Sequence, residues 1–545
     1  MLYAVVRDWL ETFLAHARDS YEAPLPRYVE DELRGYLKCG VFAHGFVRAH
    51  CDSCGHDLLV AFSCKARSVC PSCAGRRMAN TAAHLVDRVL PAVPVRQWVL
   101  SLPWELRALA AFKADVLSAL ARIFVGAIFA RHQAWAKGQG LGESPTGAVT
   151  HVQRFGSSIN LNVHFHVMVL DGVFSRDELG RPVFHRAPPP TRAELDEVVR
   201  RVHRQATTWL ARKGHLRASA DAPSQETPAP TSLDACAAIA MGRGMVRALR
   251  DDHDAELDGA PDVQPPPAAD GAVEHDGFNL HASVVVAGDD DLGRERLMRY
   301  GTRPQLALDR LRRLPGGRLA YRIKKLRGGR AKHRVMTPLE FLARLAAIVP
   351  PPRYPLLRYH GVLGPRSSWR RDVVPQPREP RPCAPRHAPA GKNRARQGGR
   401  PRLPGDAATA QQPVAAMATS APTPGSESVV KAPSVLGRAA SADAPATATA
   451  VLLAPNILST KHWNRLLGGS LYAASPRVDW ATLLRRTFEV DVLRCVGCGG
   501  RLCVLGEVTE PSLVAVVLES LGVPTDPPRV ARARDPTELL EVVGD

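Results

Sequence analysis

Two short cysteine motifs near the beginning of the chain place the strongest constraint on its fold. In each motif two residues separate a pair of cysteines, as in Cys51–Cys54 and Cys70–Cys73. Two such knuckles can supply the four thiolates of a closed tetrahedral zinc site, and the bound metal adds folding energy that a small unit lacks. The spacing therefore predicts a structural Zn2+ site made of Cys51, Cys54, Cys70 and Cys73.

Further cysteines leave this ligand set partly open. Cys64 lies between the two knuckles and could replace one ligand, and Cys39 and His44 are also nearby. A third motif, Cys495–Cys498 followed by Cys503, has no second knuckle downstream, so a loop with buried thiols is as good an interpretation as a metal site. The 11 cysteines cluster in short steps rather than spreading as a disulfide framework would, which favours a reducing compartment.

The charge balance points to a polyanionic partner. Lys and Arg number 72 against 53 Asp and Glu, which gives a net charge of +19 and makes nucleic acid the first candidate. Cations beside the second knuckle are candidate phosphate contacts, although a solvated basic rim would have the same composition: Lys65, Arg67, Arg76 and Arg77. No apolar run is long enough to span a bilayer, so we expect a cytoplasmic protein without membrane contacts.

Hydrophobic periodicity divides the chain into segments. A helical period over 105–136 gives way to a period of two over 147–155 and 160–170, which predicts an α+β domain built on an antiparallel sheet. Three Pro- and Ala-rich segments have too few apolar residues to pack into a core. Their composition predicts two inserts and a disordered linker. The expected organisation is a zinc-binding domain over 1–100, a second domain over 101–370 with inserts near 218–231 and 251–276, a linker over 371–455, and a small C-terminal α/β region over 456–545.

A histidine pair marks a second metal site. In the strand-like text around His164 and His166, apolar residues alternate with polar ones, so both imidazoles face the same side and can converge on one divalent ion. A hairpin would bring Gln153 beside them as a third ligand, with Asp171 and His151 behind it. Two imidazoles and an amide oxygen favour Mn2+ over Mg2+, and the spacing also leaves Zn2+ open.

Tyr300 lies near the end of a helical segment rich in arginines, which would attract a DNA backbone. By position alone a core or surface role is favoured over a catalytic one, because an aromatic residue that ends a helix is ordinary. The candidate cations are Arg299 and Arg303 around this tyrosine, and Lys324 and Lys325 in a basic hairpin. The fallback tyrosines in the same domain are Tyr321, Tyr354 and Tyr359.

Several of these segments together resemble the transposases of the insertion-sequence-ninety-one family. The resemblance covers roughly residues 34–371 and rests on AFSCKARSVCPSC, VPVRQWVLSLPWELR, QRFGSSINLNVHFHVMVLDGVF and RYGTRPQLALDRL. That family is similar to rolling-circle replication initiators and relaxases. The resemblance implies an HUH-type nuclease domain, named for its His-hydrophobic-His motif, with a central antiparallel sheet flanked by helices and a tyrosine nucleophile.

For this chain the resemblance implies strand transfer through Tyr300. The tyrosine would cut single-stranded DNA at element ends and hold the 5′-phosphate covalently, with the divalent ion polarising the phosphate. Family members with two catalytic tyrosines place them one helical turn apart, whereas Arg296 occupies the corresponding position here. One tyrosine would act sequentially or in a homodimer. Because no nucleotide-binding loop is present, a host helicase would supply unwinding, and the bacterial protein would be associated with the nucleoid.

Two other functions remain compatible with the residues. A zinc-dependent DNA-binding regulator would use His164 and His166 structurally, break no bond and tolerate loss of Tyr300. A metal-dependent nuclease would use water as its nucleophile and leave no covalent adduct. Metal dependence alone does not separate the nuclease from the transposase.

Overall fold

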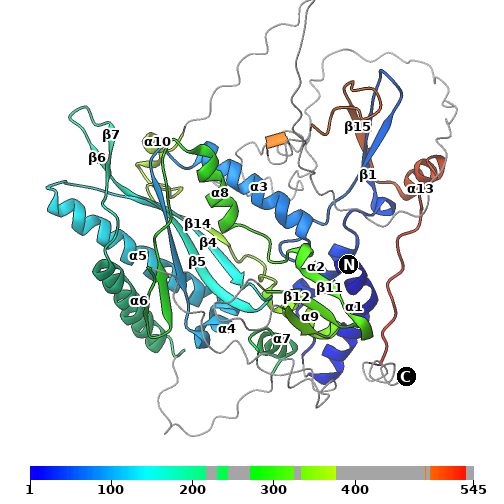
Figure 1. Ribbon diagram of the computed structural model, residues 1–545, viewed down its shortest axis with the longest axis horizontal. Helices are drawn as coiled ribbons and strands as arrows, with labels where there is room; N and C mark the ends of the chain where they lie inside the picture. The colour runs from blue at the N-terminus through cyan, green and yellow to red at the C-terminus, as the bar shows by residue number, and fades with distance from the viewer. Residues whose placement is uncertain are drawn as a thin grey trace, which may run out of the picture. The chain divides into compact units, whose positions relative to one another are not determined.

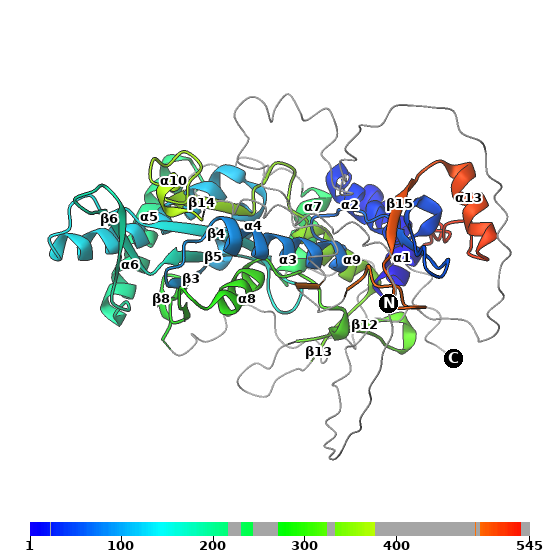
Figure 2. The same ribbon diagram turned by 90° about the horizontal axis from the view of Figure 1, so that it is seen from above.

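An antiparallel sheet of seven strands lies at the centre of the fold. The computed structural model describes residues 1–21, 23–215, 230–242, 271–323, 333–375, 485–486 and 491–535. All but five residues of the expected linker, and most of the two expected inserts, lie outside these ranges. The observed mixture of helices and antiparallel strands confirms the α+β class (Figures 1 and 2).

Consecutive neighbours in this sheet are β14, β4, β5, β3, β9 and β8, and the short strand β10 also pairs with β3. The alternation of apolar and polar residues predicts β4 and β5 to within one residue of their observed ends. The bounds are β14 Leu357–Gly361, β4 Gly147–Phe155, β5 Leu161–Leu170, β3 Val95–Ser101, β9 Phe278–His281, β8 Val273–His275 and β10 Val285–Val286.

Helices cover both faces of the sheet, so β5 is buried along nearly its whole length. Val163, Phe165 and Val167 enter the larger core, and Met168 enters a second core on the opposite face. The second core includes residues of α3 (Pro71–Arg88) and α8 (Asp291–Gly301), which lie beside each other in both views (Figures 1 and 2). Helices contributing to the larger core include α4 Trp104–Phe112, α5 Ala114–Gly138, α6 Arg192–Arg212, α7 Ser232–Ala240 and α9 Pro338–Ile348.

The N-terminal region forms a separate, smaller sheet. Strands β1 and β2 make a hairpin, and β15 from near the other end of the chain pairs with β1 (Figure 1). The elements of this region are α1 Leu2–Ser20, α2 Arg27–Leu37, η1 Phe42–His44, β1 Phe46–His50, β2 Asp57–Ala61, β15 Cys503–Val508 and α13 Pro511–Ser520.

The described residues also form two small sheets and one short helix. The basic segment forms a hairpin of β12 and β13, whose connecting residues, including Lys324 and Lys325, lie outside the described ranges. The remaining bounds are β6 Gly172–Arg176, β7 Pro182–Arg186, β11 Leu311–Arg313, β12 Leu319–Arg322, β13 His333–Met336 and α10 Arg370–Val373. Among the described helices, none is long and apolar enough to cross a membrane.

A buried ion pair fixes one end of the central sheet. Arg96 on β3 donates to both carboxylate oxygens of Asp171 at 2.7 and 3.0 Å, and both side chains are at most 5% exposed. Arg96→Met would leave the carboxylate buried without this partner, so we expect a loss of about 3–5 kcal/mol in the free energy of unfolding. Urea denaturation measures the effect. The control is Arg204→Met, because the Arg204–Glu197 pair is exposed and should contribute less than about 1 kcal/mol.

His132 on α5 predicts sensitivity to acid. Burial lowers its pKa from 6.5 to about 4, and its Nδ1–H donates to the carbonyl of Ile128. The unfolded chain therefore takes up a proton near pH 6.5 while the folded chain does not, so stability is full above pH 6.5 and falls towards pH 4. Between pH 7 and 5, His132 should account for a loss of about 2 kcal/mol. Urea denaturation of wild type and His132→Gln at both pH values checks this, and equal losses in the two proteins would contradict it.

Candidate active site and cysteine clusters

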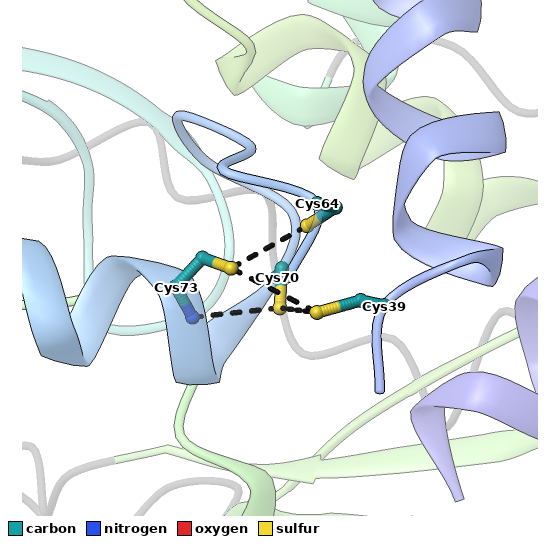
Figure 3. A group of neighbouring side chains, drawn as sticks. All are labelled: Cys39, Cys64, Cys70 and Cys73. Carbon is teal, nitrogen blue, oxygen red and sulfur yellow. Dashed lines mark hydrogen bonds between the residues drawn. The ribbon is translucent and has the colours of Figure 1, made fainter. Parts of the chain in front are cut away.

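Four cysteines from the N-terminal region form the first cluster, here called cluster A. Cys39 follows α2, Cys64 follows β2, and Cys70 and Cys73 open α3 (Figure 3). Sulfur atoms lie 3.8 Å apart in Cys39 and Cys73, 3.5 Å apart in Cys64 and Cys73, and 3.6 Å apart in Cys39 and Cys70. Tetrahedral zinc with Zn–S bonds of about 2.3 Å requires sulfur separations of about 3.8 Å, so the donor set and spacing fit a structural zinc ion.

The predicted single site of Cys51, Cys54, Cys70 and Cys73 needs correction, because the structure divides these knuckles between two clusters. The knuckle of Cys51 and Cys54 lies at the tip of the β1–β2 hairpin, whereas Cys39 and Cys64 lie at its base. A strand of five residues spans about 17 Å, which is too far for one metal to bridge. Cys64, considered only as a replacement ligand, joins Cys70 and Cys73 together with Cys39.

The second cluster, cluster B, combines the first knuckle with the third. It contains Cys51, Cys54, Cys495 and Cys498, whose sulfur atoms lie within 4.8 Å of one another. No second knuckle follows the third motif in the sequence. The knuckle that completes its cluster lies more than 400 residues upstream. Cys503 is exposed and stays outside both clusters.

The histidine pair and Gln153 lie together on neighbouring strands. Gln153 on β4 is directly opposite His164 on β5, as the hairpin prediction requires, and His151 is opposite His166. The side chain of Gln153 and both imidazoles are almost fully buried. Burial lowers the pKa of His164 to about 4 and that of His166 well below 6.5, so both rings are neutral near pH 7.

Unpaired atoms in this group fit a divalent ion. The Nε2 atom of His166 and the Oε1 atom of Gln153 are buried without a hydrogen-bond partner among the described residues. The Nδ1–H of His164 donates to the carbonyl of Asn162 at 2.9 Å, which leaves its Nε2 lone pair available. The amide nitrogen of Gln97 lies 2.8 Å from Nδ1 of His166. An amide turned so that its oxygen faces Nδ1 would accept the ring proton there and free Nε2 of His166 for a metal.

Tyr300 lies against this group at the end of α8. Its ring packs edge-on against His166, with 5.4 Å between ring centroids, and 44% of the residue is exposed. The Nε2–H atoms of Gln153 donate to the carbonyls of Tyr300 and Gly301 at 2.9 and 3.0 Å. A Cβ atom at Gly301 would come within 2.8 Å of the His151 ring, so glycine permits the helix end to approach the strands.

The alternatives to these residues have other partners. Tyr321 and Tyr354 are 2% exposed; the hydroxyl of Tyr321 accepts from the amide of Ala307, and that of Tyr354 donates to the carbonyl of Ala110. Burial raises the pKa of Tyr359. Asp171, a fallback metal ligand, is held by Arg96. Tyr300 is therefore the tyrosine of this set with substantial exposure beside the histidines.

The basic residues predicted to contact DNA differ in the contacts that their side chains already make within the protein. Arg67 donates to the carbonyls of Pro351 and Tyr354 at 3.0 and 2.7 Å, so its guanidinium holds the cysteine loop against the segment after α9. Arg77 donates to the carbonyls of Arg67 and Lys65. Lys65 is itself exposed, and Arg76 is half-buried. Arg67 thus has a structural role that its place in a basic run does not reveal.

A cavity of about 150 Å3 adjoins Gln153 and the residues after Tyr300. Arg303 lines it and stacks over the rings of Tyr300 and Phe155 at 5.0 and 5.4 Å. Arg299 instead pairs with Glu295 on α8. Four arginines line the cavity, which adjoins the predicted metal site at Gln153: Arg67, Arg77, Arg154 and Arg303.

Three features of the site were not predicted from the sequence. They are the contact of Gln97 with His166, the contact of Asn162 with His164, and the place of Arg154 in the cavity lining. The period of two on β5 places the Asn162 side chain on the face of the histidines, but the contact with His164 uses the backbone carbonyl of Asn162, which that pattern does not indicate. Gln97 contacts His166 from β3, and that pairing depends on a residue 69 positions earlier in the chain, for which the sequence near His166 gives no signal.

Two family models match the chain. The model described as "Transposase zinc-binding domain" matches residues 5–102, and the model described as "Putative transposase" matches residues 147–370. These matches define a transposase, a DNA-processing and DNA-binding protein, with a structural zinc-binding domain at its N-terminal end. The chain belongs to the insertion-sequence-ninety-one family of transposases. Searches of curated proteins and of solved structures found no match.

Proposed function

We propose that this transposase cuts and rejoins single-stranded DNA at element ends through a covalent intermediate on Tyr300. The observation that carries the proposal is the placement of a partly exposed tyrosine against His166, beside two buried ligand atoms that have no hydrogen-bond partner in the described part of the chain. His164, His166 and Gln153 would hold a Mn2+ or Mg2+ ion. When bound, the ion supplies positive charge that polarises the scissile phosphate.

In the cleavage step the Oη atom of Tyr300 attacks the phosphorus in line. The new bond joins Oη to phosphorus and the bond from phosphorus to the 3′-oxygen breaks, while the phenol proton is lost and the departing 3′-oxygen gains one. The products are a 5′-phosphotyrosine and a free 3′-hydroxyl. Rejoining reverses the step when a 3′-hydroxyl attacks the phosphotyrosine.

The surrounding residues orient the nucleophile and attract the strand. Gln153 binds the backbone carbonyl of Tyr300, so the helix end is attached to the strand that supplies a metal ligand. Arg303 stacks on the tyrosine ring and lines the adjoining cavity, where its charge favours a phosphate. Lys65 and Arg76 could contact the DNA further out, and so could Lys324 and Lys325 outside the described residues.

One tyrosine must serve two strand transfers in this scheme. Arg296 is exposed one helical turn before Tyr300 and offers no second hydroxyl. We therefore propose either sequential use of Tyr300 or a homodimer in which each copy supplies one tyrosine. Unwinding would fall to a host helicase.

The experiment incubates the purified chain with labelled single-stranded DNA from the element ends, with Mn2+ or Mg2+. The expected result is a protein–DNA adduct that survives denaturation, maps to the Tyr300 peptide and leaves a free 3′-hydroxyl. His166→Ala should abolish it while binding of the DNA persists. Cleavage without an adduct would favour the water-using nuclease, and binding without cleavage would favour the regulator.

A further inference from the structure

We propose that cluster B is a second structural zinc site, which fastens the C-terminal segment 491–523 to the β1–β2 hairpin. Its ligands would be Cys51 and Cys54 from the hairpin and Cys495 and Cys498 from the segment. The matched zinc-binding model ends at residue 102 and so contains only half of this ligand set. This proposal is independent of the chemistry at Tyr300.

The two knuckles have the same local geometry. The amide of Gly55 donates to the carbonyl of Cys51 at 2.8 Å, and the amide of Gly499 donates to the carbonyl of Cys495 at 2.9 Å. Both glycines have positive φ, +75° and +72°, a conformation that favours glycine directly after the second cysteine. Each knuckle therefore presents its two sulfur atoms in the same way, as two equivalent halves of one tetrahedral site.

The spacing of the sulfur atoms favours a metal over a disulfide. Cys51 and Cys498 are 3.5 Å apart, and Cys54 and Cys495 are 3.6 Å apart. These separations exceed a disulfide bond of about 2.05 Å and approach the separation of about 3.8 Å that tetrahedral zinc requires. Four thiols converging from two knuckles form the closed set typical of structural zinc.

The packing around cluster B is small, which gives a metal there a structural role. β15 pairs with β1 from Phe46 opposite Val508 to His50 opposite Cys503, and α13 buries Val514 and Leu518 against Phe46. Much of β15 is exposed, and the buried clusters on this sheet contain four and three residues. A core of this size provides little stability, so zinc binding would supply the free energy that keeps the segment in place.

Beyond α13 the segment continues along the first helix of the chain. The amide of Ala531 donates to the carbonyl of Arg7, and the amide of Arg534 donates to the hydroxyl of Thr12. The guanidinium of Arg534 lies over the ring of Trp9 at 4.8 Å. Loss of zinc from cluster B should therefore make residues 491–535 more sensitive to protease, because the β15 pairing, the small core under α13 and these contacts would then hold the segment without a metal.

The test measures the zinc content of the full-length chain by plasma mass spectrometry. We expect two Zn2+ per wild-type chain, and one in each of three variants: Cys51→Ser/Cys54→Ser, Cys495→Ser/Cys498→Ser, and the combination of all four. Equal loss in the three variants identifies one shared site. Cys503→Ser is the matched control, because this exposed cysteine lies on β15 outside cluster B, and it should retain two.

A cobalt titration of the wild-type chain keeps the test independent of how the variants fold. Two equivalents of Co2+ should bind with the absorption of tetrahedral thiolate coordination, and Cys495→Ser/Cys498→Ser should halve that absorption and accelerate tryptic cleavage within 491–535. One equivalent in the wild type would overturn the proposal. Retention of two Zn2+ by the Cys495→Ser/Cys498→Ser variant would overturn it as well.

Discussion

Tyr300→Phe is expected to eliminate the covalent adduct and to lower strand cleavage by at least about 10^3-fold, because phenylalanine lacks the attacking hydroxyl. The contacts that position this residue do not use that hydroxyl. Gln153 binds the backbone carbonyl, and His166 and Arg303 contact the ring. The substituted side chain should therefore occupy the same place, and affinity for single-stranded DNA should change by less than about twofold.

The measurement pairs a denaturing gel with a binding assay on the same DNA. Tyr321→Phe is the matched control, because Tyr321 is buried in the same domain and its hydroxyl accepts a hydrogen bond from the amide of Ala307. Its loss should cost about 1 kcal/mol of stability and leave the adduct unchanged. Cleavage by Tyr300→Phe at the wild-type rate would exclude Tyr300 as the nucleophile and favour a nuclease that uses water.

The sequence predicted the parts of the fold that depend on local periodicity. Alternation in β4 and β5 identified both strands, and the short connection between them brought Gln153 opposite His164. The same alternation put the two histidines on one face. The sequence did not indicate that both faces of the sheet are covered. On β5 one face is apolar, and the other carries the polar side chains of His164 and His166.

Features that depend on distant segments could not be predicted in this way. The partition of Cys51 and Cys70 into different clusters depends on the length of one hairpin and on a knuckle more than 400 residues away. The charge of Arg67 similarly suggested DNA contact, but its guanidinium donates to two carbonyls of the segment after α9. In both cases the residue type indicated the kind of interaction, but the sequence did not indicate which residues would be the partners.

Cys70→Ser is expected to release one Zn2+ per chain and to lower strand cleavage by roughly tenfold or more. Structural zinc sites contribute about 10–16 kcal/mol in isolated zinc-finger peptides, so loss of a ligand should unfold the loop around cluster A. Cys70 also caps α3, because its sulfur accepts from the amide of Cys73. Cys236→Ala is the control, since Cys236 is buried outside both clusters and should leave zinc content unchanged.

The expected loss of cleavage follows from where cluster A holds its loop. Arg67 and Arg77 lie on either side of Cys70 and Cys73 and line the cavity beside Gln153. When zinc leaves, these guanidiniums lose the backbone that positions them, and the cavity loses one basic wall. The Cys495→Ser/Cys498→Ser variant should retain most of its cleavage, because none of the residues that line this cavity belongs to cluster B or its segment. Equal losses in the two variants would show that cluster A does not act through the cavity.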